Sequence, residues 1–428
     1  MHKFIGRRSA GIRRLALAGL AATLGVLPGC DDNSEPNLPA IIPVPNSIAV
    51  ANLTGPGVPD LVVATTADEG LTQNPGYANV ILNTPGKLGT FQPGVGHPTT
   101  GTNPSSIAVA DLTGTGGLDL VVANFGTGSV SLFLHGCTTG TCAIGAFQPA
   151  VDVTTGGMPN QVVIADLNGD GKPDLVLADM SSNGNAIVLM ADPANPGKFL
   201  APMNLSTGRS TPSVAVGDLN GDGLPDIVAA TSDAAGNNGA VYVFMQNPAK
   251  RGTFLAPMIF AAGAQPQSVR IADVNGDGLL DLVVANQGPG SDGIGSAGVS
   301  VLLQDASHPG TFLAPVTYAT PGFAIDVAVG DLNGDNKPDL VVANLNPPPG
   351  GSISVLLQDP AHPGMFLPAS NYAGLSQPLS VVIADLNGDG QPDIAVADGI
   401  SATVLFQNAG AAGTFAQAVQ VGASPPPF

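Results

Sequence analysis

DLNGDGKPD, the segment Asp166–Asp174, is one of five copies of the pattern Asp-x-Asn-Gly-Asp-x-x-x-Asp in this chain. The other complete copies are Asp218–Asp226, Asp273–Asp281, Asp331–Asp339 and Asp385–Asp393. Two degenerate copies, Asn52–Asp60 and Asp111–Asp119, precede them, and successive copies start 52 to 59 residues apart. A regular period of this length indicates a repeat architecture, in which each repeat is one supersecondary unit packed on its neighbours.

The nine-residue loop has the composition of a site for a hard cation. Its odd positions carry oxygen donors, and Ca²⁺ takes about six to eight oxygen ligands in a flexible shell. Carboxylates this close together also repel one another without a counter-ion. The alternative is a turn held by Asx hydrogen bonds alone, but five complete copies favour calcium. The expected ligands, with the seventh residue of each loop supplying its backbone carbonyl, are Asp166, Asn168, Asp170, Lys172, Asp174; Asp218, Asn220, Asp222, Leu224, Asp226; Asp273, Asn275, Asp277, Leu279, Asp281; Asp331, Asn333, Asp335, Lys337, Asp339; and Asp385, Asn387, Asp389, Gln391, Asp393.

The first two copies keep fewer donors. Thr115 replaces the middle carboxylate of the second copy, and the first copy keeps Asp60 alone. We therefore expect about five structural Ca²⁺ sites, with the second loop undecided and the first without an ion. An EF-hand is excluded because its loop needs a Glu at position twelve and two flanking helices, whereas apolar residues occupy position twelve here.

Each repeat contains four short segments rich in Val, Ile and Leu and bounded by Gly, Pro and Asn. Examples are Val327–Gly330 before the loop, Leu340–Ala343 after it, Ile353–Gln358 as the third segment and Thr311–Ala319 as the fourth. This pattern is typical of strands, and no apolar stripe with a period of about 3.6 residues is long enough for a helix. The pattern predicts an all-β, seven-bladed β-propeller of four-stranded antiparallel blades with calcium-binding hairpin loops.

The block Ser213–Val228, SVAVGDLNGDGLPDIV, and the Gly-Thr-Phe turns of later repeats resemble FG-GAP/VCBS repeats. Such repeats build the N-terminal propeller of integrin α subunits and some fungal lectins. The resemblance covers residues 46–422, the expected propeller, and leaves 423–428 as a tail. It implies calcium in the hairpin between the first two strands of a blade. It implies no particular ligand, since one fold hosts many functions.

Two modes of ring closure are compatible with the sequence. Ser47–Ala51 is expected as the first strand of the ring and Thr414–Val421 as the last, so blade seven can come wholly from the C-terminal repeat. Alternatively, Ile41–Val44 can pair into the closing blade.

The N-terminus predicts export and lipid attachment. Residues 1–29 carry five basic residues and then the apolar stretch Leu15–Leu27, which is typical of a signal peptide and too short to span a membrane. Leu27-Pro28-Gly29-Cys30 resembles a bacterial lipobox, with a lipid on Cys30; an ordinary signal with an incidental Cys is the alternative. Residues 30–45 read as a flexible tether. We expect an envelope lipoprotein, periplasm-facing or surface-exposed, that meets the membrane through its lipid only.

Cys137 and Cys142 lie close together in the loop between the third and fourth strands of the second blade. An oxidising compartment favours a local disulfide. Free thiols are the second interpretation. A metal site is the third, and it lacks ligands because His135 is the only further candidate nearby.

The charge distribution argues against nucleic acid as a partner. Without residues 1–29 the chain has 8 basic and 32 acidic residues, a net charge of −24, and the seven loops hold 18 of those acids. The acidity is thus mainly a property of the cation loops, and no basic groove is present for a phosphate backbone.

No catalytic constellation is visible, so the chain is not expected to be an enzyme. Only two Glu occur, Glu35 and Glu69, and no nucleophile, zinc-protease or phosphate-loop motif is found. His308 and His362 occupy equivalent His-Pro-Gly turns, where a surface role is favoured over that of a general base.

Polar residues end the second strand in every repeat. They either cap the strand or form a polar ring around the axial channel, on the face opposite the calcium loops. They are Thr65, Asn124, Asp179, Thr231, Asn286, Asn344 and Asp398. Loops that follow such positions on a rigid scaffold commonly carry binding sites, and the resembling face of integrins recognises ligands. Candidate ligand-contacting residues there are Glu69, Tyr77, Phe125 and Asp292.

These features favour a non-enzymatic, calcium-stabilised binding or adhesion scaffold whose protein or glycan partner is unknown. A carbohydrate-binding lectin is the alternative. It is disfavoured because the chain has no Trp and only 4% aromatic residues, which leaves few platforms for stacking sugars.

Overall fold

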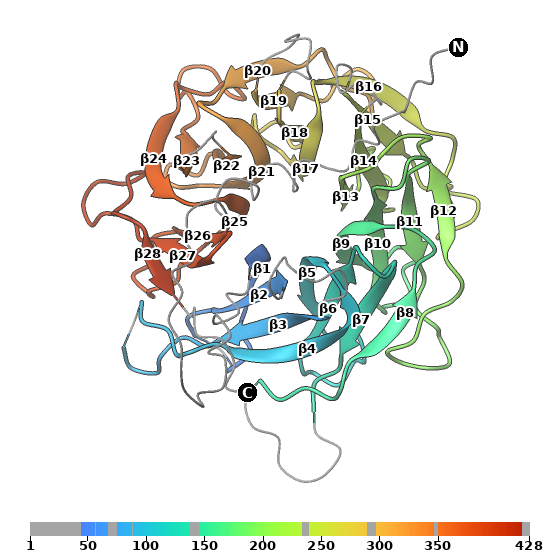
Figure 1. The fold of residues 1–428 in the computed structure, drawn as a ribbon. Helices are drawn as coiled ribbons and strands as arrows, with labels where there is room; N and C mark the ends of the chain where they lie inside the picture. Colours follow the sequence, from blue (N-terminus) through green and yellow to red (C-terminus); the bar gives the residue numbers. More distant parts are fainter. Residues whose placement is uncertain are drawn as a thin grey trace, which may run out of the picture. The chain divides into compact units, whose positions relative to one another are not determined.

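The computed structural model describes residues 44–55, 57–66, 75–87, 89–136, 145–232, 239–288, 297–345 and 350–421. These residues form seven four-stranded antiparallel sheets arranged as the blades of a ring (Figure 1). Within each sheet the strands follow one another in chain order, with the first strand around the centre and the fourth at the rim. The fold is therefore the predicted seven-bladed β-propeller. Within the described ranges no helix is long and apolar enough to cross a membrane.

The strands of the first four blades are β1 (Val44–Ala51), β2 (Asp60–Thr66), β3 (Pro75–Ile81) and β4 (Val95–Thr102); β5 (Pro104–Ala110), β6 (Asp119–Asn124), β7 (Ser129–Phe133) and β8 (Val151–Thr154); β9 (Pro159–Ala165), β10 (Asp174–Asp179), β11 (Asn185–Leu189) and β12 (Met203–Ser206); and β13 (Ser213–Gly217), β14 (Asp226–Ser232), β15 (Gly239–Phe244) and β16 (Met258–Gly263). Those of the last three are β17 (Pro266–Ala272), β18 (Asp281–Asn286), β19 (Gly298–Leu302) and β20 (Val316–Ala319); β21 (Phe323–Gly330), β22 (Asp339–Leu345), β23 (Gly351–Leu356) and β24 (Ser370–Leu375); and β25 (Pro378–Ala384), β26 (Asp393–Asp398), β27 (Ser401–Leu405) and β28 (Val419–Val421).

The second strands are buried along almost their whole length. In β6, β10, β18 and β26 every residue is buried. Both faces of a blade pack against neighbouring blades, so a strand in the middle of a sheet has no solvent face. This explains why the second strands read as continuous apolar runs rather than as alternating patterns.

The fourth strands begin later than the sequence predicts. Thr311–Ala319 was expected to be extended, whereas β20 starts at Val316. Phe312 makes only an isolated bridge to Gln304, and Pro315 then interrupts the ladder because proline has no N–H to donate. The last strand is also shorter than predicted, since β28 starts at Val419 and Phe415 only bridges to Gln407. Ala418 stands there at the place of Pro315, so the break does not require a proline.

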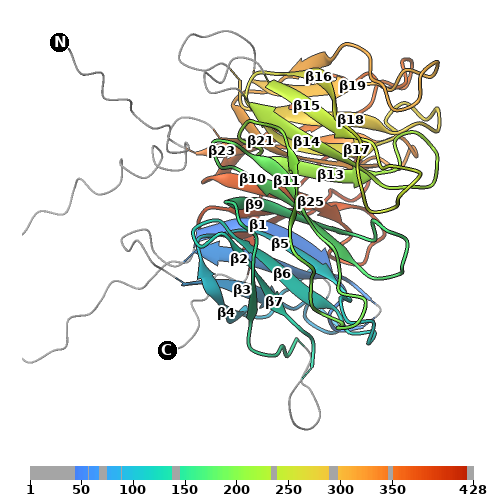
Figure 2. The same cartoon turned by 90° about the vertical axis from the view of Figure 1, so that its right-hand side faces the viewer.

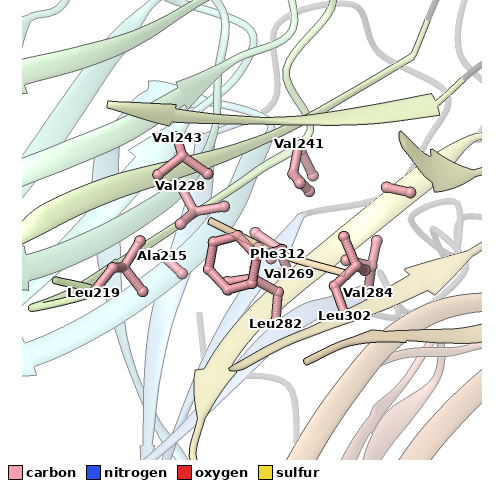
Figure 3. Close-up of a cluster of buried hydrophobic side chains, with 12 residues drawn as sticks. Ala215, Leu219, Val228, Val241, Val243, Val269, Leu282, Val284, Leu302 and Phe312 are labelled. Atoms are coloured by element: carbon pink, nitrogen blue, oxygen red, sulfur yellow. The ribbon is translucent and has the colours of Figure 1, made fainter. Parts of the chain in front are cut away.

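The hydrophobic core consists of seven clusters, and each cluster lies between two adjacent blades. Figure 3 shows the cluster between blades four and five, where Leu219 and Val228 face Val269 and Phe312. Because every interface is filled by residues of both blades, one blade alone cannot bury its apolar faces. This mutual dependence is the physical basis of a closed repeat array.

Side chains on the first strands connect successive blades around the centre. In four blades a Ser hydroxyl or Gln carbonyl oxygen accepts the N–H of a first-strand residue in the following blade. The pairs are Ser47 with Ile107, Ser106 with Val162, Gln161 with Val214, and Ser213 with Val269. Asp326 does the same for Val381, at 3.1 Å, and its other oxygen binds Arg270 at 2.7 Å. These bonds satisfy the inner edges of sheets that would otherwise present unpaired backbone groups.

Blade seven is formed wholly by the C-terminal repeat, because β25–β28 make one sheet and β1–β4 another. Val44 pairs with Thr66 inside blade one, so it does not exchange into the closing blade. Residues 41–43 lie outside the described residues. The seam between the two ends of the ring is closed by side chains, including a hydrogen bond from Asn83 Nδ2 to the Leu386 carbonyl at 2.8 Å.

Asn83→Ala is expected to loosen this seam. The substitution leaves the buried Leu386 carbonyl without its partner and should cost about 1–3 kcal/mol of unfolding free energy. We expect faster amide hydrogen exchange in β1 and β25. The matched control is Gln304→Ala, because Gln304 bonds the Leu280 carbonyl of its own blade. If amide exchange in β1 and β25 is no faster in Asn83→Ala than in Gln304→Ala, Asn83 has no special role in closing the ring.

Candidate functional site

The repeated acidic loops all lie on one face of the ring. They connect the first and second strands of the blades, and antiparallel order places the connections between third and fourth strands on the same face. The connections between second and third strands and between successive blades lie at the other end of the strands (Figure 2). The molecule therefore has a loop face and an opposite face, and we use these two names below.

In the complete loops the first aspartate binds the backbone of its own turn. Asp218 accepts the N–H groups of Gly221 and Gly223, each at 2.8 Å. The two glycines adopt φ angles of 73° and 80°, which an L side chain rarely tolerates. In the loop of blade six, position six is instead Asn336, at a φ of 61°.

The third and fifth residues of the loop also bind each other. Asn220 accepts the N–H of Asp222 at 3.0 Å and donates Nδ2 to its carboxylate at 3.1 Å, and Asp222 accepts the N–H of Leu224 at 2.9 Å. The Asx hydrogen bonds expected of a plain turn are thus present. They occupy one lone pair of each oxygen and leave others available to a ligand.

The ninth residue is buried and plays a structural part in every blade. One carboxylate oxygen accepts the N–H of loop position two, and the other accepts the N–H of the residue just after the third strand. In blade four these are Leu219 and Gln246, which bind Asp226 at 2.9 and 2.7 Å. The equivalent aspartates are Asp60, Asp119, Asp174, Asp281, Asp339 and Asp393.

Position nine is predicted from the sequence as a metal ligand only, and this second role is found in the structure alone. The signal was visible, since Asp60 and Asp119 persist in the two loops that lost other donors. The residue two positions after the third strand is an amide in five blades, but the group that binds the aspartate is its backbone N–H, which the sequence does not mark. These amides are Asn83, Gln246, Gln304, Gln358 and Gln407.

Burial and the neighbouring carboxylates make the ionised form of four of these aspartates less favourable. The pKa of Asp226, Asp281, Asp339 and Asp393 is raised to about 6, mainly by burial. Two backbone hydrogen bonds lower it, and the carboxylates at positions one and five contribute to the rise. A nearby divalent cation would favour the ionised form and reverse these shifts.

The donor set fits a hard cation by its chemistry. Each complete loop offers carboxylate, amide and backbone carbonyl oxygens and contains no Cys or His, which suits Ca²⁺ rather than a softer metal. Among the described residues, however, no three acidic, His or Cys side chains converge around one point as a metal site.

The degenerate loops differ in how they are held. In blade two, Asp111 accepts the N–H groups of Thr115 and Gly116, at 3.1 and 2.6 Å, so the turn forms without the middle carboxylate. In blade one, Thr54 donates both N–H and hydroxyl to Asp60. A threonine hydroxyl therefore takes part in both turns where the acidic donors are missing.

Six of the seven loops also support the next blade. The turn glycine between the third and fourth strands packs on the position-three residue of the preceding blade, and a Cβ added there would approach it to 3.0–3.6 Å. The pairs are Gly197 with Thr113, Gly252 with Asn168, Gly310 with Asn220, Gly364 with Asn275, Gly413 with Asn333, and Gly89 with Asn387 across the seam. A change of loop conformation therefore alters the packing at the interface between blades.

The polar residues that end the second strands are buried rather than exposed along a channel. Asp398 accepts the N–H groups of Ser376 and Gln377 at 2.8 and 2.7 Å, and burial raises its pKa to about 6. Asn286 donates to Ser300 at 2.9 Å within its own blade. These contacts match the capping interpretation.

Of the candidate ligand-contacting residues, Tyr77 and Phe125 lie at the opposite face, partly buried in β3 and in the turn after β6. Glu69 and Asp292 fall outside the described residues, as do Cys30, Cys137 and Cys142. The structure therefore places two of the four candidates, both at the opposite face.

The two turn histidines lie on the surface. His308 Nδ1 contacts Asp305 at 2.9 Å, and His362 Nδ1 contacts Asp359 at 2.8 Å, each within one turn. Each pair caps its own turn, as expected of a surface role.

Comparison with known proteins relates most of the ring to one repeat family. The model of the FG-GAP-like repeat matches residues 112–177, 166–229, 218–284 and 285–342, which together cover more than half of the chain, and an FG-GAP repeat model matches 266–303. Integrin alpha-V of Gallus gallus is 35% identical over 147 residues, which is 31% of this chain and 13% of that protein. The chain thus corresponds to a small part of that relative's length.

One solved structure shows the same fold at low identity, and a second is reported beside it. A candidate 6-phosphogluconolactonase from Bacteroides uniformis superposes with a TM-score of 0.51 at 14% identity, covering 89% of this chain and 98% of that one. BBS1N in complex with ARL6DN gives a TM-score of 0.49 at 16% identity, covering 85% of this chain and 92% of that one.

The two roles of the loop acids can be separated by mutation. Asp60→Asn places an amide NH₂ opposite a buried N–H and should lower the unfolding free energy by about 1–3 kcal/mol, in EDTA as well as in calcium. Asp222→Asn, at the exposed fifth position, should lower stability only when calcium is present. Chemical denaturation with and without EDTA measures both. Wild-type stability of Asp60→Asn would contradict the structural role of position nine.

The raised pKa values predict an unusual pH dependence for the protein in EDTA. Burial raises the pKa of four loop aspartates to about 6 in the folded chain, against an ordinary value of 3.8, so the folded state holds their protons more tightly. Stability is then greatest with the groups protonated and is lost as the pH rises through about 6. The melting temperature in EDTA should therefore increase between about pH 7.5 and pH 5. Saturating calcium should make the melting temperature nearly independent of pH. A melting temperature in EDTA that falls as the pH is lowered from about 7.5 to 5 would contradict the prediction.

Proposed function

Because the chain belongs to the FG-GAP-like repeat family, we propose that it is a non-enzymatic binding or adhesion scaffold, stabilised by calcium and anchored by lipid at the bacterial cell envelope. The observation that carries the proposal is the combination of a rigid seven-bladed ring with cation-type loops on one face only.

Calcium would act as a structural ion. The oxygen donors of positions one, three, five and seven lie in exposed turns that are packed on the neighbouring blade through position three. An ion that neutralises the carboxylates would hold the turn closed and so steady the interface between blades. Ligands that bind only the folded state stabilise it by about 2.7 kcal/mol per site at a hundredfold excess over Kd.

The opposite face is the better candidate for partner recognition. Among its described connections Arg209 is the only charged residue, whereas the loop face carries most of the acids and bases. Met158, Phe323 and Ile400 are 40%, 37% and 45% exposed there. A surface of this kind suits a partner recognised by apolar contacts and hydrogen bonds, and connections on a rigid scaffold are common binding sites.

The lipid anchor rests on sequence. The basic and apolar segment before Cys30 has the order of an export signal, and the Pro-rich stretch up to residue 45 would separate the propeller from the membrane surface. Metabolic labelling with an alkyne fatty acid should mark the wild-type protein and leave Cys30→Ser unlabelled. Equal labelling of both proteins would contradict lipid attachment at Cys30.

Calcium should raise the melting temperature of the purified propeller, and EDTA should reverse the rise. Asp222→Ala should reduce the number of bound ions by one and loosen blade four locally. Isothermal titration and amide exchange measure these effects, and Thr115→Ala in the degenerate loop of blade two is the control. An identical melting curve with calcium and with EDTA would contradict a structural role for the ion.

The scaffold function is tested by affinity capture from envelope extract. The wild-type protein is compared with a variant in which Met158, Phe323 and Ile400 are each replaced by Ser, and with a control variant in which Leu200, Leu255 and Leu313, exposed elsewhere, are replaced likewise. A partner held by the wild type and the control but lost from the first variant would support recognition at the opposite face. Capture that is unchanged in all three would reject that face.

A further inference from the structure

Five Asn-Gly pairs occupy one place in the molecule, positions three and four of the complete loops. They are Asn168, Asn220, Asn275, Asn333 and Asn387, each followed by Gly. Asn-Gly is the dipeptide in which an asparagine is most easily attacked by the following backbone nitrogen, because glycine has no Cβ to hinder the approach. The loops therefore contain five potential sites of covalent change.

The reaction needs only water. The glycine nitrogen forms a bond to Asn Cγ, the Cγ–Nδ2 bond breaks, and ammonia leaves with the proton from the backbone nitrogen. Water then opens the resulting five-membered imide at either carbonyl and yields aspartate or isoaspartate. The first product turns a neutral amide into a carboxylate, and the second also adds a methylene to the main chain.

Four of the five loops clamp the carboxamide at both ends. Asn168 accepts the N–H of Asp170 at 2.8 Å and donates Nδ2 to its carboxylate at 3.2 Å. Gly169 meanwhile donates its N–H to Asp166 at 2.7 Å, away from the carboxamide. The same arrangement recurs at Asn220, Asn275 and Asn387. Attack on Cγ must first break these bonds.

The loop of blade six lacks half of the clamp. Asn333 accepts the N–H of Asp335 at 2.9 Å, but within the described part of the chain its Nδ2 donates no hydrogen bond. The backbone of Asp335 also lacks the bond to the first aspartate that the other loops make; that oxygen of Asp331 instead accepts the N–H of Asn333, at 3.2 Å. Asn336 replaces the position-six glycine of the other four loops, which makes it the residue that distinguishes this turn.

We propose that Asn333 is the preferred site of spontaneous deamidation among the loops of the folded protein. Its leaving nitrogen is unrestrained, whereas the other four are held. The reaction adds a negative charge to a loop that already contains Asp331, Asp335 and Asp339, and so changes one blade only. This inference does not depend on the proposed function, because the hydrogen bonds that rank the sites are formed without any ion.

The test is peptide mapping by mass spectrometry after incubation of the purified protein at mildly alkaline pH in EDTA. One hydrogen bond of about 1 kcal/mol corresponds to a rate about fivefold higher at Asn333 than at the other four loop asparagines. Asn183, exposed in the turn after β10 and followed by Gly184, gives the rate of an unclamped pair in the folded chain. In guanidinium chloride the five loop sites should react at similar rates.

Two reciprocal variants test whether the residue at position six sets the deamidation rate of the asparagine at position three. Asn336→Gly should slow Asn333 to the rate of the other loops, and Gly278→Asn should accelerate Asn275, since asparagine tolerates the positive φ of this position. Circular dichroism and melting temperature verify that both variants fold. Equal native rates at all five loops, or a rate at Asn333 that does not change in Asn336→Gly, would overturn the proposal.

Discussion

The fold depends on one buried ion–dipole contact repeated in every blade. The ninth residue of each loop is an aspartate without solvent exposure, and its two oxygens accept N–H groups from the turn before the second strand and from the end of the third strand. One side chain thereby joins the two connections that emerge on the loop face. A buried carboxylate is costly unless its oxygens are bound, so the surrounding backbone has little freedom to rearrange. The acidic loop is thus part of the blade before any question of a cation arises.

The ring closes without exchanging a strand between the two ends of the chain. Blades one and seven meet as any other pair does, through an apolar cluster that contains Ile48 and Val63 on one side and Leu386 and Val404 on the other. The hydrogen bond between Asn83 and the Leu386 carbonyl recurs at other junctions, where Gln358 and Gln407 reach the position-two carbonyl of the preceding loop. Closure therefore uses apolar and amide contacts of the kinds found at other junctions, across a seam that has no peptide connection.

The two faces of the ring are suited to different tasks. The loop face concentrates acids that repel one another, and burial raises the pKa of several of them, so this face gains most from a divalent ion. The opposite face carries little charge in its described connections and exposes a few apolar side chains. A structural ion on one side and a partner on the other would not compete for the same residues, which is the physical rationale of the proposed scaffold.

The number of blades, the strand count and the place of every acidic loop could be predicted from the sequence, because they follow from local periodicity and from turn residues with special backbone angles. The sequence pattern placed Val327–Gly330 and Leu340–Ala343 in strands, where β21 and β22 contain them. The predicted fourth strands were too long, because the break after the bridging phenylalanine has no constant sequence mark: Pro315 stands there in blade five and Ala418 in blade seven. Only the tertiary structure decided that the ring closes by side-chain contacts, that polar residues such as Asn286 and Asp398 are buried caps, and that Asp60 binds a backbone amide far along the chain. Those outcomes depend on which distant residues meet, and a one-dimensional pattern does not record such contacts.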